Sequence, residues 1–154
     1  VYLGEAQLQW LIDALVRSKA TFKFVAIGGQ VLNSAPVFEN YSTYPKEREK
    51  LLSLLAKEEI KNVIFLTGDR HKTELSKITR NGIDYYDLTV SPLTATAYNS
   101  DDEPNENRVE GTHYGKRNFG MVELSGNYKK RKAKLIIYNT AGEEVWSRTI
   151  KRQQ

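Results

Sequence analysis

The hydrophobic residues near the N-terminus predict a helix followed by a strand. From Glu5 to Ser18 they recur every three or four residues, as on one face of an amphipathic helix. A short β-rich stretch, Phe22–Ile27, then stops at Gly28 and Gly29, which is typical of a buried strand that ends in a turn. The apolar positions of the helix are Leu8, Leu11, Ile12, Leu15 and Val16.

A second helix and a second strand follow in the same order. Pro45 suits the first position of a helix because its missing N–H has no partner there, and the apolar face continues to about Glu59. Asn62–Thr67 is a nearly continuous apolar run, as in a parallel strand covered on both faces. Two helix–strand units in series predict an α/β fold with a layered sheet and flanking helices.

The second half of the chain has a different pattern. Tyr85–Val90 predicts another strand, and the polar stretch Thr94–Lys116 has no clear periodicity and predicts a long loop. Three further β-rich segments, separated by turn residues, predict a C-terminal antiparallel β meander. These segments are Phe119–Leu124, Ala133–Tyr138 and Glu144–Ile150.

Composition narrows the possible chemistry. A chain of 154 residues with 40% hydrophobic and 27% charged residues is the size of a single domain, here residues 1–154, and it contains no apolar run of membrane-spanning length. The net charge of +4 is too small to require a polyanionic partner, although it permits an anionic substrate. Because there is no cysteine, disulfides, thiolate metal sites and cysteine nucleophiles are excluded. Only His71 and His113 are left for imidazole chemistry.

The loop after the strand Asn62–Thr67 is the strongest candidate site. Ligands bind in open α/β sheets where loops leave the carboxyl ends of strands, and this loop places Asp69 and His71 two residues apart. Their oxygen and nitrogen atoms suit Zn, Fe or Mn, and Arg70 is a possible anion clamp. An ordinary turn in which Asp69 caps the next segment remains the alternative.

Other candidates lie in neighbouring loops. Gln30 follows the first strand and shares an edge with Asp69 if the two strands are parallel neighbours, although the local sequence by itself favours a simple tight turn. Tyr44 lies at the start of the second helix, where backbone amides are available to hold an anion. His113 is either a solvated loop residue or a ligand. The basic run Lys129–Lys134 has the composition of a nucleic-acid patch, yet its position between two strands favours an exposed hairpin loop.

Several segments together resemble the C-terminal half of the PhoD-like alkaline phosphatases, a branch of the calcineurin-like metallophosphoesterases. They occur in the same order over nearly the whole chain, and the central one contains Gly68-Asp69-Arg70-His71. The segments are Leu3–Leu11, Ser18–Ala20, Phe22–Val25, Gly29–Val31, Tyr44–Arg48, Val63–His71, Ser91–Leu93 and Asn118–Gly120.

The resemblance implies half of a metallophosphoesterase β-sandwich and a metal-activated hydroxide that attacks a phosphate ester. Asp69 and His71 would be metal ligands, for Fe, Ca, Zn or Mn, and Gln30 would be a polar active-site residue. Arg70 and Arg117 would serve as auxiliary clamps. Tyr44, Arg117 and Asn118 are the candidate substrate-binding residues.

The upstream metal-binding segments of that family have no counterpart here. With at most two ligands the set is incomplete, so we expect the missing N-terminal half to be a required partner and the isolated chain to bind metal weakly and hydrolyse little. Relatives commonly act outside the bacterial cytoplasm, which implies a periplasmic or secreted protein. The alternative is a non-catalytic α/β module that binds an anionic or carbohydrate ligand, and a nucleic-acid binder using the basic run is a third possibility that we do not favour.

Overall fold

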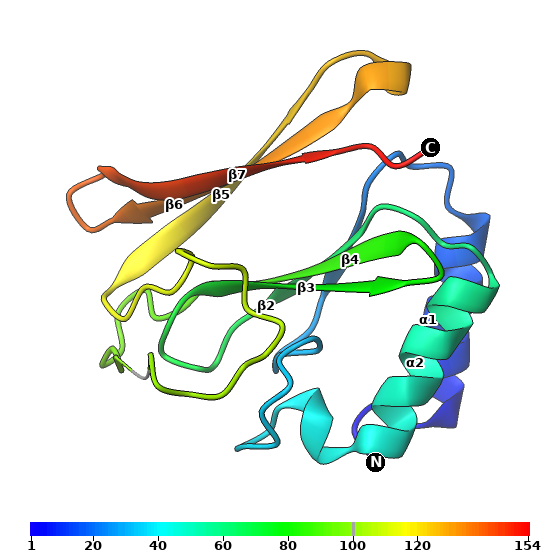
Figure 1. Ribbon diagram of the computed structural model, residues 1–154, viewed down its shortest axis with the longest axis horizontal. Coiled ribbons are helices and arrows are strands. Elements are labelled where there is room, and N and C mark those ends of the chain that lie inside the picture. The colour runs from blue at the N-terminus through cyan, green and yellow to red at the C-terminus, as the bar shows by residue number, and fades with distance from the viewer. Residues whose placement is uncertain (100) are drawn as a thin grey trace.

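Two helices and two β-sheets stack as three layers in the computed structural model, which describes residues 1–99 and 101–154 (Figure 1). The helices cover one face of a central sheet, and a smaller sheet covers the other face. In chain order the elements are α1 (Glu5–Arg17), β1 (Lys23–Ala26), the 3₁₀ helix η1 (Tyr41–Thr43), α2 (Pro45–Lys57), β2 (Val63–Thr67), β3 (Glu74–Arg80), β4 (Ile83–Thr89), β5 (Asn118–Ser125), the 3₁₀ helix η2 (Tyr128–Lys130), β6 (Lys132–Asn139) and β7 (Glu144–Lys151).

The central sheet has the strand order β1-β2-β4-β3. β1 and β4 both pair in parallel with β2, while β3 runs antiparallel to β4. Successive side chains of a strand point to opposite faces, so Phe65 packs with the helices and Ile64 packs with the smaller sheet. Burial on both faces explains why β2 is almost continuously apolar.

The two helices bury the apolar faces that the sequence predicts. α1 places Leu8, Ile12 and Leu15 against the sheet, and α2 buries Leu51 and Leu55 beside them. α2 starts with a proline in its first turn, where no backbone donor is lost. No helix among the described residues is both long and apolar enough to span a membrane.

The smaller sheet is the predicted antiparallel meander, with the order β5-β6-β7. Its inner face contributes Leu135, Ile137 and Trp146 to a second apolar cluster, which also contains Ile64 and Leu88 of the central sheet. The hairpin between β5 and β6 projects beyond the central sheet, in yellow and orange in Figure 1. The predicted α/β fold with flanking helices and a C-terminal meander is therefore confirmed.

One strand was not predicted. β3 and β4 form a hairpin whose turn contains Asn81 and Gly82, both with positive φ. The sequence contained this turn signal, but β3 buries Glu74 and Ser76, so it has no apolar alternation to mark it.

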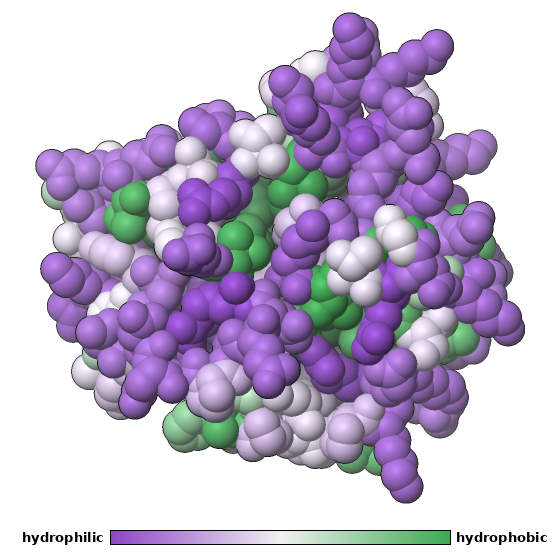
Figure 2. All heavy atoms as spheres, viewed as in Figure 1, coloured by the Kyte–Doolittle hydropathy of each residue, from purple (hydrophilic) through white to green (hydrophobic). Residues whose placement is uncertain are grey.

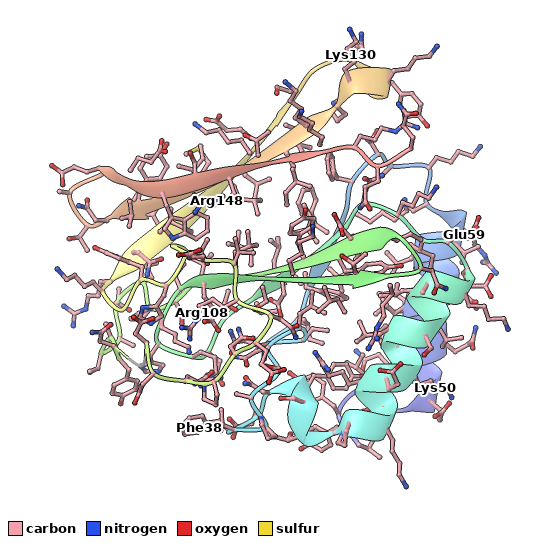
Figure 3. All side chains as sticks on the ribbon, viewed as in Figure 1. Phe38, Lys50, Glu59, Arg108, Lys130 and Arg148 are labelled. Carbon is pink, nitrogen blue, oxygen red and sulfur yellow. The ribbon has the colours of Figure 1, made fainter. Side chains whose placement is uncertain are left out.

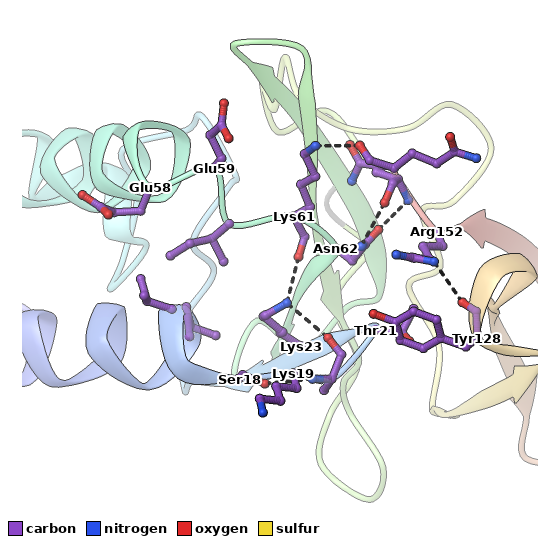
Figure 4. Close-up of a pocket in the computed structure, with 16 residues that line it drawn as sticks. Ser18, Lys19, Thr21, Lys23, Glu58, Glu59, Lys61, Asn62, Tyr128 and Arg152 are labelled. Atoms are coloured by element: carbon purple, nitrogen blue, oxygen red, sulfur yellow. Dashed lines mark hydrogen bonds between the residues drawn. The ribbon is translucent and has the colours of Figure 1, made fainter.

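The chain end is fixed at the opposite edge of the central sheet from the loops that follow β1, β2 and β4. A hollow of about 300 Å³ lies there, between the ends of the helices and the last residues, and Figure 4 shows the residues that line it. Lys61 Nζ donates to the carbonyl oxygen of Gln154 at 2.6 Å, and the Gln153 amide donates to Asn62 Oδ1 at 2.7 Å. These contacts attach the meander to the strand preceding the candidate loop.

Candidate functional site

The loops that follow β1, β2 and β4 meet at one edge of the central sheet, because these three strands run in the same direction. The Gly68 amide donates to the carbonyl oxygen of Gly28 at 3.0 Å, and the Val90 amide donates to that of Thr67 at 2.9 Å. The arrangement is the usual place for a ligand site in an open α/β sheet.

A pocket of about 660 Å³ opens at this edge. Three of its residues, Phe38, Asp69 and His71, have φ values of 50°, 66° and 53°. Side chains other than glycine rarely adopt this left-handed conformation, and such strain is found preferentially at functional sites. The pocket is lined by Phe38, Glu39, Asp69, Arg70, His71, Tyr98 and Glu103.

The ring of His71 is held in one orientation and one tautomer. It stacks on Tyr98 with ring centroids 5.0 Å apart, and its Nδ1 lies within hydrogen-bond distance of the Thr96 carbonyl oxygen. A carbonyl oxygen only accepts, so Nδ1 carries the proton and Nε2 of the neutral ring has a free lone pair. Histidines that bind metals are commonly fixed in this way by a backbone carbonyl.

Asp69 differs from its neighbours in being solvent-exposed. Among the described residues its carboxylate has no hydrogen bond or ion pair, although it lines the pocket together with His71. An exposed carboxylate and an imidazole with a free lone pair in one pocket are two candidate donors for a metal ion.

Arg70 points inward, although it also lines the pocket. Its guanidinium bonds Glu103 Oε2 at 2.6 Å, Asn40 Oδ1 at 2.7 Å and Gln30 Oε1 at 2.8 Å, and it lies 4.9 Å from the centre of the Phe38 ring. Burial opposes ionisation of Glu103, but hydrogen bonds from Arg70 and Asn33 and the charge of Lys72 outweigh it and hold the pKa of this carboxyl below its ordinary value.

Gln30 lies beneath Arg70 and is completely buried. Its amide nitrogen donates to Glu74 Oε1 at 2.7 Å and to Thr89 Oγ1 at 2.8 Å, and its oxygen accepts from Arg70 and Asn33. All these bonds hold Gln30 as a positioning residue behind the loop. It does not line the pocket.

The predicted loop is attached to β3 by buried ion pairs. Lys72 Nζ lies 3.1 Å from Glu103 Oε1 and 3.7 Å from Glu74 Oε1, and Arg108 Nε donates to Glu74 Oε2 at 2.6 Å. Glu103 and Arg108 belong to the predicted loop Thr94–Lys116, and these ion pairs fix its residues 103–108 beside the site; residue 100 of this loop lies outside the described residues. Sequence reasoning did not identify these residues, because they become partners only in the folded chain.

Asp87 of β4 supports the same region from below. Its carboxylate accepts hydrogen bonds from the amides of Val31 and Leu32, at 2.7 and 2.8 Å, and from Thr67 Oγ1 at 2.7 Å. Burial raises its pKa to about 6 despite these bonds. The carboxylate orients the backbone just after Gln30.

The other predicted residues lie outside this pocket. The ring of Tyr44 packs against that of Tyr2 in a tilted arrangement, with centroids 5.6 Å apart. Arg117 Nε donates to the carbonyl oxygen of Ala95. Asn118 is buried, accepting from Thr73 and donating to the carbonyl oxygen of Ser91, so it joins β5 to the edge loops. Burial lowers the pKa of His113, whose Nε2 has no hydrogen-bond partner among the described residues.

The metal-binding capacity of the described residues is limited. Within residues 1–99 and 101–154 no group of three or more His, Cys, Asp or Glu side chains is arranged to hold a metal ion. The structure brings Asp69 and His71 into one pocket with Arg70, with Gln30 directly behind, and leaves Tyr44, Arg117 and Asn118 outside it.

Comparisons with known proteins agree with the fold. The chain is 29% identical over 84 residues to alkaline phosphatase D of Bacillus subtilis (strain 168), which covers 49% of this chain and 14% of that protein. A solved structure, "Structure of PhoD", superposes with a TM-score of 0.67 at 17% identity and covers 99% of this chain, showing that the two share a fold. The chain corresponds to only 36% of that structure's chain. The model of the PhoD-like phosphatase family matches residues 1–135, so this chain belongs to the PhoD-like phosphatase family.

Proposed function

We propose that this chain is the C-terminal part of a metal-dependent phosphatase or phosphodiesterase and that Asp69 and His71 supply two of its metal ligands. The observation that carries the proposal is their placement in one pocket, with the Nδ1 of His71 bonded to the Thr96 carbonyl oxygen and Nε2 left free. Membership of the PhoD-like phosphatase family supports a phosphate ester as the substrate.

The donor set fits a transition metal in part. A carboxylate and an imidazole suit Fe, Zn or Mn, whereas Ca²⁺ prefers oxygen ligands and would use Asp69 only. Two ligands do not hold a catalytic metal, so the remaining ones would come from the N-terminal half of the domain, which we propose as the partner of this chain. A bound metal would lower the pKa of a coordinated water and neutralise charge on the phosphoryl group.

Arg70 and Gln30 would help to hold the phosphate group rather than bind the metal. Arg70 lines the pocket, but its guanidinium is already paired with Glu103, so we assign it only an auxiliary role in holding the phosphate. Gln30 would hold the Arg70 guanidinium in place through its side-chain oxygen. Tyr44, Arg117 and Asn118 stay predictions for substrate contact, as does a periplasmic or secreted location.

Metal binding by the purified chain tests the ligand assignment. We expect weak binding of Mn²⁺ and Zn²⁺ in calorimetric titrations, and a loss of at least about tenfold in affinity in Asp69→Asn and in His71→Gln. Asp102→Asn and His113→Gln are matched controls, because they remove the same groups outside the pocket. Equal affinity in all four variants would refute the assignment.

Activity tests the incomplete site separately. We expect the metal-supplemented chain to hydrolyse bis(p-nitrophenyl) phosphate at the rate of the metal alone, and a chain extended upstream by the other half to hydrolyse it faster. Measurable turnover by the present chain would contradict the divided site. Tight binding of an anion or a sugar without any metal would instead favour a non-catalytic module.

A further inference from the structure

The hairpin between β5 and β6 and the end of β7 together form a small pocket whose lining, among the described residues, consists of cations. Its volume is about 280 Å³. Lys130 marks it at the tip of the projecting hairpin in Figure 3, and Figure 2 shows hydrophilic side chains covering this part of the surface. The lining residues are Lys129, Lys130, Arg131, Lys132, Lys151 and Arg152, which we call the basic pocket.

No ion pair among the described residues balances the charge of the basic pocket. None of its six cations forms an ion pair with any described residue. Their combined charge exceeds the net charge of +4 of the whole chain. Lys132 and Lys151 also lie directly opposite each other in neighbouring strands, an arrangement that destabilises a sheet unless an anion lies between the charges.

Hydrogen bonds and packing within the protein hold the backbone of the basic pocket and the side chain of Arg152 in place. The Arg152 amide donates to the carbonyl oxygen of Arg131 at 3.0 Å, and Arg152 packs over the ring of Tyr128 at 4.5 Å and bonds its carbonyl oxygen, as Figure 4 shows. Arg131 Nε is buried and has no hydrogen-bond partner among the described residues. A buried donor without a partner is costly, so this part of the hairpin is not fully satisfied by the described residues.

The basic pocket is remote from the candidate metal ligands. β5 starts at Asn118, whose amide bonds the carbonyl oxygen of Pro92 in the edge loops, and ends at Ser125, opposite Lys132. The seven residue-to-residue steps from Asn118 to Ser125 separate the two regions by roughly 24 Å at about 3.4 Å per step. An anion in the basic pocket is therefore out of reach of Asp69 and His71.

We propose that the basic pocket binds an anion carrying several phosphoryl groups. Lysine and arginine at this density match the charge and the acceptor oxygens of phosphates, and the pocket is too small for a large ligand. No aromatic residue is among the described residues that line the pocket, and the nearby ring of Tyr128 already packs on Arg152, so the arrangement does not favour stacking of successive nucleic-acid bases. The phosphoryl groups belong either to a free oligophosphate or to the headgroups of an anionic lipid. This inference does not rest on the proposed function.

Calorimetric titration with inorganic tripolyphosphate tests the site. We expect saturable binding of about one ligand, weakened at least about fivefold in Lys132→Gln/Lys151→Gln. Lys46→Gln/Lys57→Gln removes the same charge from the exposed surface of α2 and should bind like the parent. Asp69→Asn/His71→Gln should also bind like the parent, which separates this site from the proposed metal site. Loss of binding in that variant, or equal binding by the two lysine variants, would overturn the proposal.

Vesicles distinguish the source of the phosphates. Sedimentation with phosphatidylglycerol–phosphatidylcholine vesicles, but not with phosphatidylcholine alone, that is lost in Lys132→Gln/Lys151→Gln would identify lipid headgroups. Tripolyphosphate binding without sedimentation would identify a free oligophosphate. Binding of single-stranded DNA as tightly as tripolyphosphate would refute a phosphate pocket in favour of a general polyanion surface, and binding of none of these probes would refute the site.

Discussion

Glu103 neutralises two buried cations beneath the candidate site. Arg70 and Lys72 have side chains only 6% and 0% exposed, and their nitrogens lie 2.6 and 3.1 Å from its carboxylate. Replacing Glu103 with Gln removes the negative charge that pairs with both buried cations. We therefore expect the free energy of unfolding to fall by about 3–5 kcal/mol. Urea denaturation at pH 7 measures it. Glu106 is exposed in the same loop, so Glu106→Gln should change the free energy of unfolding by less than about 0.5 kcal/mol. An equally small loss in Glu103→Gln would contradict the proposed role of Glu103.

Asp87 should make stability depend on pH. Its pKa of about 6 lies above that of an unfolded aspartate, so between pH 4 and 6 the native state holds the proton more tightly and stability falls as pH rises. From pH 4.5 to 7.5 the free energy of unfolding of the parent, minus that of Asp87→Asn, should fall by about 2 kcal/mol.

A matched control isolates this effect. Asp84→Asn should show no such difference over the same range, because the pKa of Asp84 is lowered below its ordinary value and the group is ionised throughout. Burial opposes that ionisation, but hydrogen bonds from Lys77 and Thr79 outweigh it. A flat difference for Asp87→Asn in urea titrations would mean that its hydrogen bonds from Val31, Leu32 and Thr67 compensate for burial.

At the scale of elements, the β3–β4 hairpin depends on its turn. Gly82 has φ 76° and Asn81 has φ 50°, as in the two-residue turns that match the twist of antiparallel strands. Gly82→Ala should lower the free energy of unfolding by about 1 kcal/mol, because an L side chain is strained at this φ even though space is available. Gly28→Ala also meets no neighbouring atom and has no positive φ, so equal losses in the two variants would contradict this explanation.

The same hairpin illustrates which elements could be predicted from the sequence and which could not. The helices and β2 were predictable because their apolar periodicity reflects burial against neighbours of any identity. β3 was missed because Glu74 and Ser76 are buried by polar partners, Asn105 and Arg108, from a loop about 30 residues later. No local pattern encodes such pairing.

The candidate site also combines features that the sequence predicts with features that depend on residues distant in sequence. The position of Asp69 and His71 in a pocket at the sheet edge was predictable, because a loop that follows a parallel strand lies where ligands usually bind, which requires only the order of elements. The tautomer of His71 depends on Thr96, and the inward orientation of Arg70 depends on Glu103, both from the long loop. Interactions between side chains distant in sequence decide these features, and they appear only in the folded chain.

At the scale of the whole molecule, the central sheet joins the two apolar clusters. Phe65 belongs to the cluster under the helices and its neighbour Ile64 to the cluster under the meander, so disrupting one face disturbs the strand that supports the other. A fold with a shared central layer should therefore unfold as one cooperative unit, as expected for a single domain over residues 1–154.

The two tryptophans allow a direct test of this cooperativity. Trp146 is buried in the cluster under the meander, while Trp10 is 67% exposed on α1. In Trp10→Phe, fluorescence reports only the meander side, whereas far-UV circular dichroism also reports the helices on the opposite face. We expect both signals to give the same urea midpoint. If the meander formed a separate unit, fluorescence would change first, and Ile64→Ala would shift only the fluorescence transition. In a single domain, the cavity that Ile64→Ala creates would lower both urea midpoints together and reduce the free energy of unfolding by about 2–5 kcal/mol.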